Sequence, residues 1–89
     1  MTHPLREQSE NVINLFRSGD YEAGNMAVAQ WIDTFQKTIP ELSQTEQDES
    51  WLKNFLAAFL DAQEREDYMF IADLLEGEFL KKIVWETEE

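Results

Sequence analysis

Apolar residues recur at helical spacing along almost the whole chain, and every strand signal is weak. A chain of 89 residues buries only about 60–65% of its unfolded surface, so it supports a single core. The sequence therefore predicts one all-α domain spanning residues 1–89. Short connections between four amphipathic segments force neighbouring helices to run in opposite directions, and we expect an antiparallel up-and-down four-helix bundle.

A glycine turn separates the first two predicted helices. Pro4 suits a first helical turn, and the apolar pattern extends that helix to about Ser18. Gly19 breaks the pattern, and Asp20 is a good N-cap for the second helix. The second helix should end before Pro40, because proline disfavours helical geometry in the residue that precedes it. Its apolar face consists of Tyr21, Gly24, Val28, Trp31, Ile32, Phe35 and Ile39.

A polar loop leads into the third predicted helix, residues 46–64. Ser43 and Thr45 are each followed by an acid three residues later, which is the pattern of a capping box. Residues 64–67 either form a tight connection in which Asp67 caps the fourth helix or continue the helix through a bend, and we favour the connection. An Asp-Tyr pair opens both the second and the fourth helix, which hints at two related helical hairpins. Apolar residues cover half the circumference of the third helix: Trp51, Leu52, Phe55, Leu56, Phe59 and Leu60.

The last predicted helix, residues 67–85, has more apolar surface than one buried face can use. On a 3.6-residue wheel its core stripe is Tyr68, Ile71, Ala72, Leu75, Phe79 and Ile83. The opposite side should be polar, but it carries a second row: Phe70, Leu74, Gly77, Lys81, Val84 and Trp85. Either the rest of the fold covers this row or another chain binds it. A glycine inside a helix costs about 1 kcal/mol relative to alanine, so Gly77 marks either a kink or helix end, or a close approach of a partner helix.

Charge limits the classes of partner. Nineteen acidic and seven basic residues give a net charge of −12, and most of the excess lies in residues 41–89. This distribution repels nucleic-acid backbones and anionic membranes, so we expect neither as a partner. The chain has no cysteine, and Met1–Glu7 lacks the pattern of a secretory signal. We therefore expect a cytoplasmic protein.

The residues that support catalysis or metal binding do not form a known pattern. His3 is the only histidine, so neither a di-iron carboxylate centre nor a histidine-activated serine can be assembled. Asp73, Glu76 and Glu78 lack the spacing of a calcium loop. We expect no enzymatic activity, no metal and no cofactor.

One stretch of the chain resembles a known group of proteins. Residues 67–76 are similar to a D-Y-x-x-x-A-D-L-L-E stretch of small, uncharacterised, all-helical bacterial proteins. This resemblance implies a helical fold and a bacterial cytosolic setting, and it implies no activity. A looser likeness, in size, charge and helicity, is to the acidic helical bundles that act as flagellar or type III export chaperones.

The sequence therefore favours a non-enzymatic interaction module. It would either self-associate as a homodimer or bind a helical protein partner, and the second row of the last helix would be the partner-binding surface. The alternative is an acidic regulatory inhibitor, toxin-neutralising or nucleic-acid-mimicking, that occupies a basic surface, or an export-chaperone-like protein. Salt distinguishes the interaction module from the acidic inhibitor. Exposed charges are screened over about 10 Å at 0.1 M salt, so the affinity of the inhibitor should fall steeply with salt, whereas the affinity of the apolar surface should change little.

Overall fold

The computed structural model describes residues 4–42 and 45–82, which form helices and tight turns without any strand. Three regular helices come first: α1 (Pro4–Arg17), α2 (Tyr21–Leu42) and α3 (Glu46–Glu64). A fourth helix changes type along its length, from α4 (Tyr68–Leu74) through the π-helical η1 (Leu75–Phe79) to α5 (Leu80–Lys82). The prediction of an all-helical fold is confirmed for these residues.

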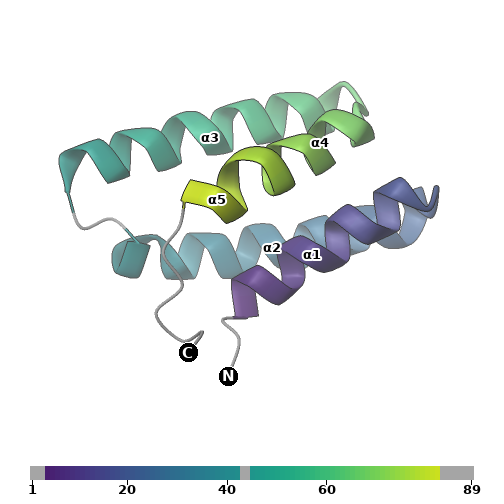
Figure 1. The fold of residues 1–89 in the computed structure, drawn as a ribbon, viewed down its shortest axis with the longest axis horizontal. Coiled ribbons are helices and arrows are strands. Elements are labelled where there is room, and N and C mark those ends of the chain that lie inside the picture. Colours follow the sequence, from purple (N-terminus) through teal and green to yellow (C-terminus); the bar gives the residue numbers. More distant parts are fainter. Residues whose placement is uncertain (1–3, 43–44, 83–89) are drawn as a thin grey trace.

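The helices form two hairpins that pack against each other (Figure 1). One hairpin consists of α1 and α2, and the other of α3 and the fourth helix. Across the hairpins, α1 contacts α4 and η1, and α2 contacts α3. The two hairpin turns lie at the same end of the molecule, where Tyr21 stacks on Tyr68 with ring centroids 4.7 Å apart.

Side-chain caps fix where the helices begin. The Asp20 carboxylate accepts a hydrogen bond from the Ala23 amide at 3.3 Å, and Gly19 adopts the left-handed φ of 84° that the turn requires. Thr45 Oγ1 accepts a hydrogen bond from the amide of Asp48. The segment 64–67 is a tight connection, in which Asp67 accepts a hydrogen bond from an α4 amide. These cap positions agree with the sequence prediction.

The core is built around Trp31. Its indole is fully buried and stacks on Phe35 and Phe59 with centroid separations of 4.8 and 4.6 Å. Phe79 meets the same indole edge-on at 5.4 Å. Aromatic pairs in these geometries add to the free energy of burial, and this cluster joins the two hairpins. The indole N–H donates a hydrogen bond to the buried hydroxyl of Ser9 at 2.7 Å.

The predicted end of the second helix was wrong. The helix continues through Pro40 to Leu42. Proline has a helical φ, but it removes one amide hydrogen bond and its ring crowds the carbonyl four residues earlier, so it disfavours the last turn without forbidding it. Ile39 and Leu42 pack against the core, and this tertiary packing overrides the local preference of the residue before proline.

The last helix is not the regular α-helix that a 3.6-residue wheel assumes. The amide of Leu80 donates its hydrogen bond to the carbonyl of Leu75, five residues earlier, which is the pattern of a π-turn. This wider turn changes the angular position of every later side chain. The part of the prediction that concerns residues 83–85 lies outside the described residues.

Candidate functional site

The predicted partner-binding row does not form one continuous surface in the described residues. Leu74 is only 4% exposed and belongs to the core, which corrects its assignment to the outer side of the helix. Phe70 is 39% exposed, and the Arg65 guanidinium lies over its ring at 5.9 Å. Gly77 and Lys81 are exposed. Val84 and Trp85 lie outside the described residues.

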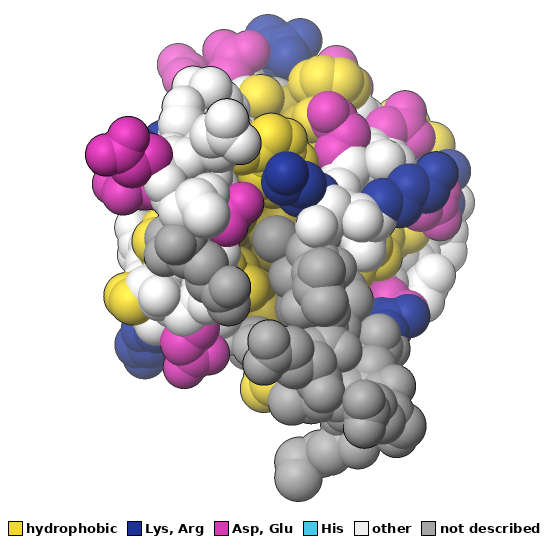
Figure 2. All heavy atoms as spheres, turned by 60° about the vertical axis from the view of Figure 1, so that its left-hand side comes forward, with side chains coloured by type: hydrophobic (Ala, Val, Ile, Leu, Met, Phe, Trp, Pro, Cys, Tyr) yellow, Lys and Arg dark blue, Asp and Glu magenta, His cyan; other side chains and the backbone are white. Residues whose placement is uncertain are grey.

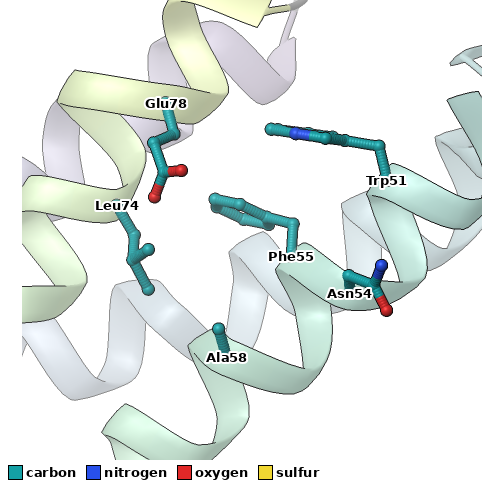
Figure 3. Close-up of a pocket in the computed structure, with 6 residues that line it drawn as sticks. All are labelled: Trp51, Asn54, Phe55, Ala58, Leu74 and Glu78. Carbon is teal, nitrogen blue, oxygen red and sulfur yellow. The ribbon is translucent and has the colours of Figure 1, made fainter.

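The structure places an apolar groove beside this row, between α3 and the fourth helix (Figure 3). Its volume is about 160 Å³. Leu74 and Glu78 form one wall, which spans the junction of α4 and η1. The opposite wall and the floor come from α3, and the complete lining is Trp51, Asn54, Phe55, Ala58, Leu74 and Glu78.

The aromatic cluster of the core holds the floor of the groove in place. Phe55 is 5% exposed and lies 5.2 Å from Phe79 and 6.2 Å from Trp31, measured between ring centroids. Trp51 stacks on Phe55 at 5.3 Å and is itself half-buried. A floor anchored in this way keeps its shape without a ligand, as is common for binding sites.

Polar groups border the groove. Asn54 and Glu78 are exposed, and Figure 3 shows the Glu78 carboxylate directed toward the space between the two helices. Among the described residues no cation pairs with Glu78. The ammonium of Lys82 lies 5.8 Å from the centre of the Trp51 ring, a cation–π contact at the edge of the groove. Figure 2 shows hydrophobic side chains gathered in a band on this side of the molecule, with charged side chains around it.

Neighbouring charges form ion pairs on the surface. The Lys53 ammonium donates a hydrogen bond to the carboxylate of Glu49 and lowers the pKa of Glu49 below its ordinary value. Arg17 bridges α1 to the fourth helix by pairing with Asp73 and Glu76. All of these groups are exposed, so the pairs contribute little to stability. In the described part of the chain, no group of three or more His, Cys, Asp or Glu could hold a metal ion.

The sequence prediction missed the α3 side of the groove. It assigned Trp51 and Phe55 to a helix with apolar residues over half its circumference, and it predicted no binding surface on that helix. The same width could have indicated a helix with a core face and a second, partly open apolar face. Ala58 gave no signal, because an alanine is common on any helix face.

Taken together, the described residues define a four-helix, all-α domain with an apolar surface groove. A family model matches residues 2–84 of the chain, and the chain belongs to that family, which is described as a domain of unknown function (DUF8042). No curated protein and no solved structure matches the chain. None of the described helices is long and apolar enough to cross a membrane.

Proposed function

We propose that this domain is a non-enzymatic binding module that holds a helical segment of another protein in the groove between α3 and η1. The observation that carries the proposal is an apolar groove with a fixed aromatic floor and a polar border. Its volume of about 160 Å³ accommodates one or two apolar side chains of a partner. Recognition of an amphipathic helix uses such anchors, with further residues of the helix lying along the border.

Charge supports a basic partner. The chain carries a net charge of −12, and Glu78, which pairs with no cation among the described residues, stands at the border of the groove. A segment whose apolar anchor is flanked by lysine or arginine would place a cation beside this carboxylate. A second copy of the same acidic chain would meet like charge, which disfavours the homodimer.

The arrangement and setting that we propose follow the sequence prediction. The contacts of α1 with α2 and α4, and of α3 with α2 and α4, support an antiparallel up-and-down bundle. Figure 1 supports it as well, since the chain reverses direction between successive helices. The resemblance of residues 67–76 supports a bacterial cytosolic protein.

Two neighbouring alanines on α3 allow a matched test. Ala58 lines the groove, whereas Ala57 is exposed on another face of the helix. The probe is a synthetic helix of leucine and lysine of about four turns, or ~14 residues, with a glutamate-for-lysine version as the control peptide. Binding is followed by amide chemical shifts and by tryptophan fluorescence. We expect shifts centred on Trp51 and Glu78, and a loss of affinity of about tenfold in Ala58→Gln but of less than about twofold in Ala57→Gln.

Other outcomes identify other occupants. If Trp85→Gln tightens peptide binding, the chain's own C-terminal segment occupies the groove and the proposal is wrong for the free protein. Concentration-dependent mass in sedimentation equilibrium that disappears in Ala58→Gln would instead indicate a homodimer.

Salt tests the acidic-inhibitor alternative. At about 1 M salt the screening length falls to ~3 Å, so binding through charge alone disappears. Binding anchored in the groove weakens but persists. Equal affinities of the two alanine variants, together with complete loss of binding at high salt, would favour the acidic inhibitor.

A further inference from the structure

The two hairpin turns of the domain are built in the same way. In the first turn the amides of Gly19 and Asp20 donate to the carbonyls of Phe16 and Leu15. In the second turn the amides of Glu66 and Asp67 donate to the carbonyls of Gln63 and Ala62. Both are Schellman motifs with a left-handed residue, Gly19 at φ 84° and Glu66 at φ 57°, and both lead directly into an aspartate cap. Every pair of corresponding residues in the two turns is 47 positions apart.

The same spacing relates several pairs of buried residues in the helices. On α1 and α3, Leu5 corresponds to Leu52 and Val12 to Phe59, and all four side chains are buried. The second helix of each hairpin continues the correspondence with three further buried pairs: Gly24 with Ile71, Ala27 with Leu74, and Val28 with Leu75. The correspondence is incomplete, since buried Ile13 matches the exposed Leu60 and buried Ala72 matches the exposed Asn25.

Beyond Leu75 the spacing changes from 47 to 48. Trp31 corresponds to Phe79, and both are fully buried aromatic residues. Ile32 corresponds to Leu80, and both are half-buried. The change falls within η1, whose π-turn accommodates one more residue than an α-turn. The second hairpin therefore has one extra residue, and the π-turn keeps the later side chains on the core face.

Contacts between corresponding residues support this relation. Two related hairpins packed about a pseudo-two-fold axis bring residues near that axis against their own counterparts. Tyr21 stacks on its counterpart Tyr68 at 4.7 Å. Trp31 contacts its counterpart Phe79 at 5.4 Å.

We infer that the domain is a duplicated helical hairpin, and that one residue inserted within residues 75–79 of the second copy produced η1 and shaped the binding groove. The part that concerns the groove rests on the proposed function. Leu74 precedes this segment, Glu78 lies within it, and the two side chains form one groove wall. The α1 counterparts of Asn54, Phe55 and Ala58 are Glu7, Gln8 and Asn11, all polar, so the first copy presents no equivalent apolar surface.

Deletion of Gly77 from the full chain tests the duplication. Gly77 is exposed and no heavy atom lies within 4 Å of the position of a Cβ added there. Its removal should convert η1 into a regular α-helix with Phe79 still in the core. We expect cooperative unfolding with a midpoint within about 5 °C of wild type. Hydrogen-bond couplings in NMR should show amides bonded four residues back instead of five.

The matched control is deletion of Gln30, the exposed residue that precedes Trp31 within the uninterrupted α2. This deletion turns Trp31 and all later α2 residues by about 100° away from the core, so cooperative unfolding should be lost. Equal damage from the two deletions, or an intact π-turn in the Gly77 deletion, overturns the inference.

Peptide binding separates the two parts of the inference. A folded Gly77 deletion that binds the leucine–lysine helix several-fold more weakly supports the assignment of the insertion to the groove. Unchanged binding would show that the insertion did not shape the groove, and the duplication would still stand. If wild type itself does not bind, the proposed function fails, whereas the stability comparison still decides the duplication.

Discussion

Ser9 places a hydroxyl group inside the apolar core. It accepts a hydrogen bond from Trp31 Nε1 at 2.7 Å and donates its own to the carbonyl of Leu5 at 2.8 Å, and both bonds are buried. The first bond joins α1 to α2 and holds the indole in the orientation on which Phe35 and Phe59 stack. One small polar group thus fixes the geometry of a large aromatic cluster.

We therefore expect Ser9→Ala to be strongly destabilising. The substitution leaves the buried indole N–H without an acceptor, at a cost of about 1–3 kcal/mol in the free energy of unfolding. Ser18→Ala is the control, because the Ser18 hydroxyl is exposed, and its effect should stay below about 0.5 kcal/mol. Urea denaturation measures both. Equal stabilities of the two variants would contradict the structural role of Ser9.

Two glycines that look alike in the sequence should respond in opposite ways to alanine. A Cβ on Gly24 would lie 2.3 Å from Cε1 of the buried Phe16 ring, so Gly24→Ala overpacks the core and costs about 1–3 kcal/mol. A Cβ on Gly77 meets no atom within 4 Å, and Gly77→Ala should stabilise the helix by up to about 1 kcal/mol. Thermal unfolding measures the stabilities of the two variants. A Gly24→Ala variant that is more stable than Gly77→Ala would refute the prediction.

At the scale of the element, local signals determined what could be predicted. Asp20, Thr45 and Asp67 cap helices through their own side chains within three residues, so their roles are readable from short sequence patterns. The end of α2 depends instead on how Ile39 and Leu42 pack. No local pattern in the sequence around Pro40 indicates that packing.

The π-turn escaped prediction for a related reason. No residue type specifies η1, and a helical wheel with a constant 3.6-residue period gives the wrong angular positions for the side chains after Leu75. Leu74 precedes the π-turn, and it was assigned to the surface because the wheel treats that side of the helix as open, whereas α3 packs against α4 there. The groove depends on the approach of α3 to this irregular segment, which is a tertiary property. The shift in spacing between Val28–Leu75 and Trp31–Phe79 is the one sequence signal that indicates an insertion.

The two aspartate caps should contribute similar amounts to stability, because they occupy equivalent turns. Asp20→Ala and Asp67→Ala each remove an acceptor for an amide at a helix start, and we expect each to lower the free energy of unfolding by about 0.5–2 kcal/mol. Asparagine also caps helices, so the Asp→Asn variants should retain most of the stability. Guanidinium denaturation of the four variants tests this, and large losses in the Asn variants would mean that charge rather than capping is responsible.

At the scale of the whole molecule, the core belongs to neither hairpin alone. Trp31 and Phe35 come from α2, whereas Phe59 and Phe79 come from the second hairpin. A separated first hairpin would expose the fully buried face of Trp31 to water. The hydrophobic contribution of these rings is therefore available only when both hairpins are present.

Because both hairpins contribute to the aromatic core, the domain should reassemble from two separate fragments. Cut between residues 44 and 45, each fragment alone should be largely unstructured by circular dichroism, and mixing the two should restore helix and Trp31 burial with a 1:1 midpoint. Because both fragments are acidic, their association should strengthen as salt screens the repulsion. Stable helical structure in the isolated second fragment would show that its hairpin folds without Trp31. Reassembly would make each half a reporter of the proximity of any two proteins to which the halves are fused.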